Sequence, residues 1–268
     1  SAMKKQHHPA AAAGIVFSGL CILLPLAVLA VWSISAQWAW PDILPQKFSF
    51  RALGELFGGY SGAMDALGLS VLLGLASASC STAVGTMTAR AVVFYDFPGK
   101  RWVSFAAMLP ILLPGTALAM GLHVVFLRIG LADTFAGVML AHIILSTPYT
   151  VKLMLDATEA IGRSYEEAAL TLGANSLRAF FSVSLPALLP GIAASFVMSY
   201  ILSFGDYFPT LLIGGGNVRT FTVMMVPYLQ SGDRTIAAAY SVVYMLVTLA
   251  VFFIFDLAVK RKKLITDI

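Results

Sequence analysis

Long apolar runs separated by short polar segments make up most of this chain. A helix needs about twenty residues to cross a hydrocarbon layer ~30 Å thick, and a window of that length finds six apolar runs. They are residues 14–35, 66–90, 102–127, 134–155, 187–205 and 236–259. The runs are unbroken, whereas the strands of a membrane barrel alternate in short segments. The pattern therefore predicts an all-α membrane protein with six transmembrane helices.

Composition supports a bilayer as the solvent of this chain. Of its 268 residues, 59% are hydrophobic and 11% are charged, which is too apolar for a water-soluble globular domain. Small side chains recur inside the runs, as in GLASASCSTAVGT over residues 74–86, and they let helix backbones approach closely in lipid. The helices are therefore expected to form one compact membrane domain.

Lys and Arg residues indicate how the chain crosses the membrane, because they are enriched in cytoplasmic loops. With the N-terminus in the cytoplasm, twelve of the seventeen fall on the cytoplasmic side and five on the outer side. The twelve are Lys4, Lys5, Arg90, Lys100, Arg101, Lys152, Arg163, Arg178, Lys260, Arg261, Lys262 and Lys263, and the five are Lys47, Arg51, Arg128, Arg219 and Arg234. Both termini and residues 156–186 are therefore expected in the cytoplasm. The net charge of +4 follows from this asymmetry and gives no reason to expect nucleic-acid binding.

The segment SYEEAALTLGANSLRAFFSVSLPALLPG, residues 164–191, places charges between two apolar runs. Ser164 and Glu167 have the spacing of a capping box, in which each side chain satisfies a backbone donor at a helix start. Gly173 predicts the end of that helix, because glycine adopts the left-handed cap conformation without strain. A short helix is therefore expected from Ser164 to the turn at Gly173.

A second short helix is expected after this turn. Asn175 or Ser176 can cap it through a side-chain oxygen, it extends through Phe181, and Pro186 suits the first turn of the span that follows. Two short helices joined by a bend would project from the cytoplasmic face. Residue by residue, an ordinary amphipathic loop at the membrane surface explains the same segment.

The combination of residues in this segment is more specific than its parts. It closely resembles the E-A-A-x3-G-x9-I-x-L-P signature of the permease subunits of binding-protein-dependent type I ABC importers, with Val in place of Ile. The matching residues are Glu167, Ala168, Ala169, Gly173, Val183, Leu185 and Pro186. YDFPGKR (95–101), STPYTVKLM (146–154) and SFGDYFPTLLIGGG (203–216) resemble further segments of such permeases, the last of them in the spermidine/putrescine branch.

The resemblance implies a single six-helix permease domain over residues 14–260, with the two short helices acting as coupling helices between the fourth and fifth spans. Residues 1–13 and 261–268 would then be cytoplasmic tails, and residues 1–3 are interpreted as a cloning scar. The protein is expected in the bacterial inner membrane, crossing it several times.

The resemblance also implies the partners of this chain. The signature residues would dock on a pair of cytoplasmic ATP-binding subunits. The sequence has no G-x4-G-K-[ST] phosphate loop, so ATP and Mg would be bound by those subunits, and the chain is expected to be neither an enzyme nor a holder of a metal or cofactor. A second permease subunit, homologous or identical, would complete the pore, and an extracytoplasmic binding protein would deliver the solute.

The expected solute path involves the outer end of the fifth span. Asp206 is an acid near membrane depth, which makes it a functional candidate, and Phe204 and Tyr207 could offer aromatic faces to a cation. Alternatively, Asp206 is exposed at the interface or pairs with Arg219. The acid favours a polyamine-like organic cation as solute, while phosphonates, ferric ion, thiamine and oxyanions remain alternatives within the same family.

Other functional classes have less support in the sequence. GYSG (59–62) matches the G-x-S-G pattern of rhomboid-like intramembrane hydrolases, but Ser61 falls in an outer loop with no base expected beside it. His123 and His142 fall at comparable depth on adjacent spans, where packing histidines are favoured over a proton relay. A six-span facilitator that works without ATP would have no use for the coupling signature.

Overall fold

The structure is a computed structural model that describes the backbone of residues 9–39, 41–59 and 61–266, and the side chains of residues 14–257 within those ranges. The cloning scar expected at residues 1–3 and the outermost parts of both expected tails lie outside the described residues. The described elements are α1 (Pro9–Ser33), β1 (Ser35–Gln37), β2 (Lys47–Phe48), α2 (Arg51–Phe57), α3 (Ala63–Phe94), α4 (Lys100–Leu112), α5 (Gly115–Ile129), α6 (Phe135–Ile161), α7 (Ser164–Thr171), α8 (Ser176–Ala179), the π-helical turn η1 (Phe180–Ser184), α9 (Leu185–Gly205), α10 (Phe208–Gly214), α11 (Phe221–Ser231) and α12 (Arg234–Thr266).

The described part of the chain holds five helices long and apolar enough to cross a membrane, and a sixth if the bent pair α4 and α5 is counted as one span. The third expected span, over residues 102–127, is therefore not a single helix in the structure. It breaks between Leu112 and Gly115, where the chain bends by 109° from one helix to the next. Leu113 is extended (φ −96°, ψ 144°), because a residue before proline is pushed away from helical angles and Pro114 has no N–H to continue the ladder.

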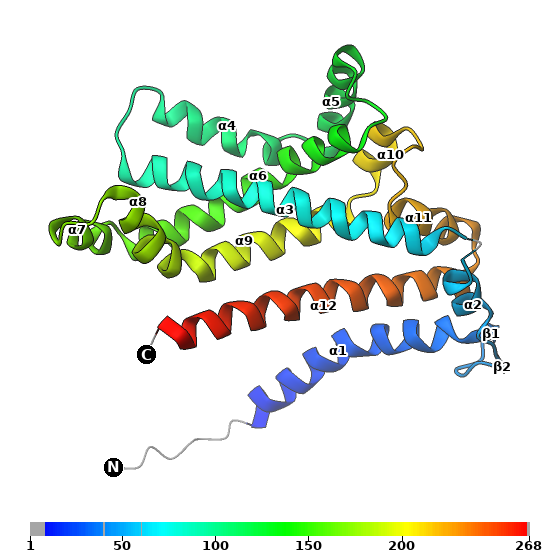
Figure 1. Cartoon of the computed structure of the whole chain (residues 1–268). Helices are drawn as coiled ribbons and strands as arrows, with labels where there is room; N and C mark the ends of the chain where they lie inside the picture. Colours follow the sequence, from blue (N-terminus) through cyan, green and yellow to red (C-terminus); the bar gives the residue numbers. More distant parts are fainter. Residues whose placement is uncertain (1–8, 40, 60, 267–268) are drawn as a thin grey trace. The chain divides into compact units, whose positions relative to one another are not determined.

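The chain divides into two compact units, of which the larger holds residues 65–224 and 246–268. Within it α3, α6 and α9 run side by side, with α7 and α8 at one end and α5 and α10 at the other (Figure 1). Leu73, Val138 and Ile213 lie in one buried apolar cluster of this unit. Met154 and Leu188 lie in another, closer to α7.

Small polar residues join the three central helices, as the small-residue pattern of 74–86 predicts. The hydroxyl oxygens of Ser81 in α3 and Ser199 in α9 lie 2.6 Å apart. The Thr150 hydroxyl of α6 donates to the Ser81 carbonyl oxygen at 3.0 Å. Such bonds hold helices together in lipid, where burial of apolar surface gives no preference for a neighbouring helix.

The smaller unit holds residues 1–64 and 225–245. The strands β1 and β2 pair antiparallel in it. Asp233 accepts a hydrogen bond from Arg51 of α2 at 3.2 Å, and the Thr235 hydroxyl donates to the Ser35 carbonyl oxygen of β1 at 2.8 Å. These contacts bind the loop after α1 to the start of α12.

Candidate functional site

The loop from α6 to α9 carries the signature residues and begins with a sharp turn at Gly162. Gly162 has φ 70°, and its N–H donates to the Thr158 carbonyl oxygen at the end of α6. Helix α7 begins at Ser164, as expected, but the capping box does not form. Arg163 holds the N-cap position with helical angles and makes no side-chain cap, so Ser164 already lies inside the helix. Glu167 instead reaches Arg163, with 3.5 Å between Oε1 and Nε.

The turn after α7 follows the prediction. Gly173 has φ 89°, and the Ala174 N–H donates to the Ala169 carbonyl oxygen at 3.1 Å, which closes the helix end in the left-handed cap arrangement. The Asn175 side chain then caps α8 by accepting from the Arg178 N–H at 2.8 Å.

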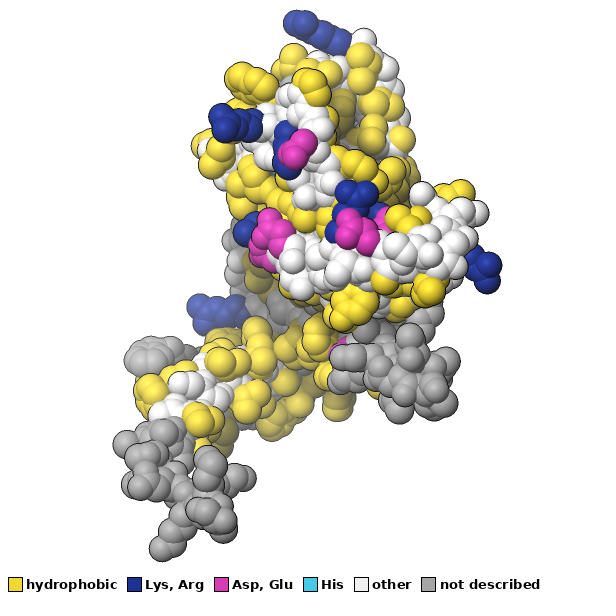
Figure 2. Space-filling model, turned by 90° about the vertical axis from the view of Figure 1, so that its left-hand side faces the viewer, with side chains coloured by type: hydrophobic (Ala, Val, Ile, Leu, Met, Phe, Trp, Pro, Cys, Tyr) yellow, Lys and Arg dark blue, Asp and Glu magenta, His cyan; other side chains and the backbone are white. Residues whose placement is uncertain are grey.

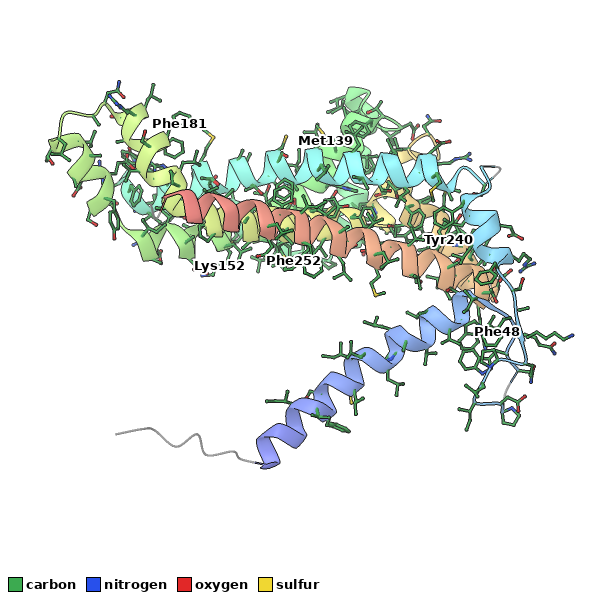
Figure 3. The ribbon with its side chains drawn as sticks, turned by 60° about the horizontal axis from the view of Figure 1, so that its bottom comes forward. Phe48, Met139, Lys152, Phe181, Tyr240 and Phe252 are labelled. Atoms are coloured by element: carbon green, nitrogen blue, oxygen red, sulfur yellow. The ribbon has the colours of Figure 1, made fainter. Side chains whose placement is uncertain are left out.

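The second coupling helix differs from expectation because it is not a separate element. Helix α8 passes through η1 directly into α9, which gives one span from Ser176 to Gly205. A π-helical turn holds one more residue than an α-helical turn, so the chain runs on without a break at Pro186. Pro186 fits there because it occupies the first turn of α9. Phe181 projects from this turn and is exposed (Figure 3).

The signature residues separate into an exposed group and a partly buried group. Glu167, Ala168 and Gly173 are exposed, and Ala169 is partly so. The remaining three, Val183, Leu185 and Pro186, are partly buried where η1 enters α9. Figure 2 looks onto this end of the larger unit, where acidic and basic side chains gather around α7 among apolar ones. The exposed group is thus available to another protein, while the other group shapes the base of the loop.

Glu166, the residue before the signature, is partly buried together with Arg90 of α3. Arg90 Nη2 donates to both carboxylate oxygens of Glu166, at 2.9 and 3.1 Å, and the Ser184 hydroxyl donates to Oε2 at 2.7 Å. Burial opposes ionisation of Glu166, but the hydrogen bonds from Ser184 and Arg90 outweigh it and lower the pKa of this carboxyl. Sequence reasoning missed this cluster, because nothing local pairs an arginine with a glutamate 76 residues away.

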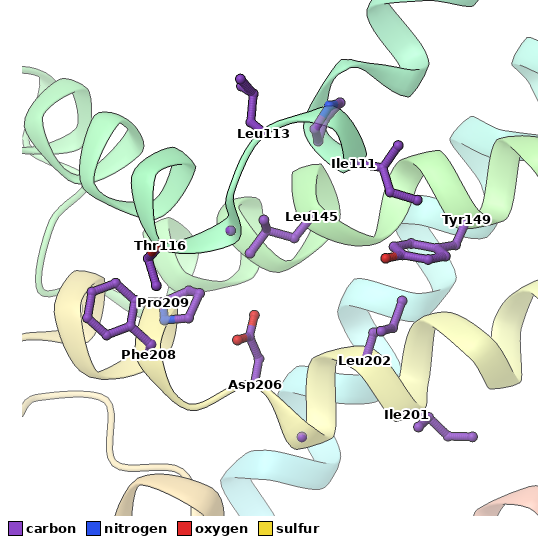
Figure 4. Close-up of a pocket in the computed structure, with 13 residues that line it drawn as sticks. Ile111, Leu113, Thr116, Leu145, Tyr149, Ile201, Leu202, Asp206, Phe208 and Pro209 are labelled. Carbon is purple, nitrogen blue, oxygen red and sulfur yellow. The ribbon is translucent and has the colours of Figure 1, made fainter.

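A cavity of about 520 Å³ lies at the junction of α4, α5, α6, α9 and α10. Apolar residues form most of its wall, together with the polar side chains of Thr116, Tyr149 and Asp206. The Asp206 carboxylate points into the space below Leu145 (Figure 4). The broken third span opens this site, because Leu113 and Gly115 on either side of the break both line it.

His142 lies beside Asp206 without neutralising it. The Ser203 hydroxyl is 2.7 Å from Nδ1, and the Thr210 hydroxyl is 2.8 Å from Nε2. The Thr210 hydroxyl donates its single proton to the Asp206 backbone oxygen at 2.9 Å, so it accepts from Nε2–H. His142 is only 1% exposed, which favours the uncharged ring, so Nδ1 then accepts from the Ser203 hydroxyl. His142 is therefore neutral in this network. Its Nε2 lies 3.9 Å from Asp206 Oδ2 with its proton committed elsewhere.

The two aromatic residues expected on the solute path do not form part of the cavity wall. Phe204 is buried (1% exposed) and stacks on Tyr200 with 5.5 Å between ring centroids. Neither Phe204 nor Tyr207 is among the residues that line the cavity. Arg219 donates to the Gly216 carbonyl oxygen at 2.9 Å, and no salt bridge joins it to Asp206 among the described residues.

The hydrolase alternative gains no support from the surroundings of Ser61. The Ser61 hydroxyl donates to the Leu56 carbonyl oxygen at 3.4 Å and accepts from the Ala63 N–H at 3.3 Å, as expected of a residue that opens a helix. Within the residues that the structure describes, no group of three or more His, Cys, Asp or Glu side chains could hold a metal ion.

The family profile described as "Binding-protein-dependent transport system inner membrane component" matches residues 81–264, which is more than half of the chain. The chain belongs to this family. It is therefore a multi-pass inner-membrane permease subunit of an ABC importer and not an enzyme.

Relatives of this permease are named for different solutes. It is 28% identical over 256 residues to the "Putative 2-aminoethylphosphonate transport system permease protein PhnV" of Salmonella typhimurium, covering 94% of this chain and 95% of the relative. It is 26% identical over 220 residues to the "Putrescine transport system permease protein PotI" of Escherichia coli, covering 78% and 75%. It is 28% identical over 200 residues to the "Molybdate/tungstate transport system permease protein WtpB" of Pyrococcus abyssi, covering 75% and 80%.

Solved structures show the same fold. A crystal structure of a bacterial ABC transporter involved in the import of the acidic polysaccharide alginate matches 96% of the permease and 98% of that chain, with a TM-score of 0.75 and 18% identity. A second structure of an alginate transporter, in complex with a periplasmic protein that holds an alginate pentasaccharide, matches with a TM-score of 0.68 and 16% identity.

Proposed function

We propose that this permease carries a small solute with an ammonium group past Asp206. The observation that carries the proposal is the position of this acid, which lines a cavity in the membrane domain and has no cationic partner among the described residues within ion-pair distance. An uncompensated carboxylate in a partly dehydrated site attracts a cation more strongly than it would in water.

The names of two relatives agree with this choice. The PhnV and PotI systems are named for 2-aminoethylphosphonate and putrescine, and each of these compounds has a primary amine that is protonated at neutral pH. The WtpB system is named for molybdate and tungstate, which are anions that an unpaired Asp206 would repel. Polyamine-like cations and aminophosphonates are therefore favoured over oxyanions.

The permease works as one subunit of a larger importer. The exposed signature residues Glu167, Ala168 and Gly173 bind one of two cytoplasmic ATPase subunits, which hold ATP and Mg. A second permease subunit completes the path, and an extracytoplasmic binding protein delivers the solute. The excess of Lys and Arg near α7 and the chain termini supports a cytoplasmic location for this loop and for both ends.

Uptake by the assembled importer in proteoliposomes tests the solute class. The probes are labelled putrescine, 2-aminoethylphosphonate and molybdate, with Asp206→Asn as variant and Asp156→Asn, an exposed acid on α6, as control. We expect uptake of an amine probe, a severalfold loss of that uptake in Asp206→Asn and no loss in the control. Molybdate uptake that survives Asp206→Asn would contradict the proposal.

A further inference from the structure

The end of α3 is fixed to the loop after α6 by a partly buried cluster of three polar residues. We call Arg90, Glu166 and Ser184 the α3–α7 clamp, because they come from α3, α7 and η1. Arg90 and Glu166 form an ion pair at 2.9 Å, with side chains 15% and 12% exposed, and Ser184 donates to the same carboxylate. Any movement of α7 relative to α3 would break these bonds in a site with little water to replace them.

Two aromatic rings hold the Arg90 guanidinium in place. Its central carbon lies 4.6 Å from the ring centroid of Phe180 and 5.2 Å from that of Phe94. A planar guanidinium stacks on rings and donates in a fixed direction, which a lysine ammonium does not. The rings thus set the direction in which Arg90 presents its two hydrogen bonds to Glu166.

The π-helical turn brings the third member to the carboxylate. Phe180 and Ser184 are the first and last residues of η1, and the wider turn lets Phe180 face Arg90 while Ser184 faces Glu166. Such turns inside helices often mark functional positions. Here the turn joins the loop to α9 without a flexible break.

Stability is a weak explanation for the clamp. Removing an arginine and a glutamate from water costs free energy that their attraction often fails to recover, and apolar residues of similar size are frequently as stable. A partly buried ion pair does, however, favour one geometry, since the alternatives leave a charge without a partner in a site that water reaches poorly. The clamp therefore suits a part that must move as one rigid piece.

We infer that the α3–α7 clamp makes α7, η1 and the end of α3 a single rigid unit. When the loop is displaced, the end of α3 therefore moves with it by the same amount. This inference rests on the proposed docking of α7 to the ATPase. It assigns different roles to two adjacent residues. Glu167, whose side chain is 61% exposed, faces the partner, whereas Glu166 faces inward and positions α7.

Distance measurements between spin labels test this rigidity. The labels are placed at Met87→Cys on α3 and Leu172→Cys after α7, which are 73% and 88% exposed, with Cys21 and Cys80 replaced by Ser. The importer is studied in nanodiscs, both nucleotide-free and trapped with ADP and vanadate. We expect one narrow distance distribution that is the same in both states. In Glu166→Gln and Arg90→Lys the distance distribution should become broad or split into several distances. In the matched control Glu167→Gln it should stay narrow and single.

Two results would overturn the inference. The first is a distance that changes between the two nucleotide states in the parent protein, because α7 would then move relative to α3. The second is a distribution that stays narrow in both Glu166→Gln and Arg90→Lys. A permease that binds no ATPase would contradict the proposed docking instead, and the comparison of Glu166→Gln with Glu167→Gln in the permease without ATPase would still decide whether the clamp exists.

Discussion

Gly85 of α3 lies directly against Thr150 of α6. A Cβ atom at position 85 would lie 2.7 Å from the Thr150 hydroxyl oxygen and 2.9 Å from the Thr150 carbonyl carbon, both closer than van der Waals contact allows. The same threonine donates to the Ser81 carbonyl oxygen one turn earlier in α3. The absence of a side chain at Gly85 is therefore a condition for the bond that joins α3 and α6.

We expect Gly85→Leu to destabilise the permease by about 1–3 kcal/mol, as overpacking does elsewhere. The backbone of Thr150 cannot rotate away as a flexible side chain could, so the helices must separate. Thermal unfolding in detergent measures the effect. Gly68→Leu is the matched control on the same helix, because nothing lies within 4 Å of a Cβ at that position. Equal melting temperatures for the two variants would contradict the close approach of α3 and α6.

The apolar runs predicted the membrane helices well because bilayer thickness imposes a minimum length on each of them. The third run, residues 102–127, did not reveal that its helix is broken, because it is as apolar as the other runs. Its break depends on Pro114, but Pro110, Pro148 and Pro190 lie within helices of the structure that continue past them. A proline in an apolar run therefore does not reveal by itself whether the helix ends.

Local backbone rules predicted the turns and caps of the loop, but they did not predict its long-range contacts. The positive φ of Gly173 and the cap by Asn175 follow from the properties of those residue types. The capping box failed because only Gly162 and Arg163 separate α7 from α6, and Arg163 is already helical. The contact of Arg90 with Glu166 depends on how distant helices pack, which a single sequence does not state.

Gly173→Val should weaken coupling between ATP hydrolysis and transport. Gly173 has φ 89°, and a β-branched residue in this conformation costs about 1–3 kcal/mol, so α7 would lose its defined end. The control Ala174→Val adds similar bulk at the next residue, where φ is not positive. Stimulated ATP hydrolysis and uptake in proteoliposomes measure the effect. Unchanged values for Gly173→Val would remove the turn from the coupling mechanism.

The loop around Glu166 should lose stability in acid. The pKa of this carboxyl lies below the ordinary value of 4.5 in the folded chain, so its contribution to stability is complete above about 4.5 and disappears as the pH falls through the lowered value. The measurement compares melting temperatures of the parent and Glu166→Gln from pH 7 downward. We expect a difference that is constant near neutrality and shrinks below about pH 4.5, where Glu166 becomes protonated. A difference that does not change with pH would mean that Glu166 is not ionised in the folded loop.

Thr210 should control whether the Asp206 carboxylate is free to meet the solute, although it does not line the cavity. Its hydroxyl accepts the Nε2 proton of His142 and donates to the Asp206 backbone oxygen. In Thr210→Val the size is kept but both bonds are lost, so Nε2–H is free to turn toward Asp206 Oδ2, 3.9 Å away. A hydrogen bond from the His142 Nε2–H would then occupy a carboxylate oxygen that the solute needs.

We therefore expect Thr210→Val to reduce uptake of the transported amine severalfold while the permease remains folded and assembled. Nitrogen NMR of histidine-labelled protein gives an independent check, with the His142 signals assigned by their loss in His142→Gln. In the parent protein, Nε2 should be protonated and Nδ1 should not. Ser203→Ala is the control, since it removes a donor to Nδ1 and leaves the bond from Nε2 to Thr210 intact, so uptake should fall less. Normal uptake in Thr210→Val, or a proton on Nδ1 in the parent, would show that His142 does not keep Asp206 available to a cation.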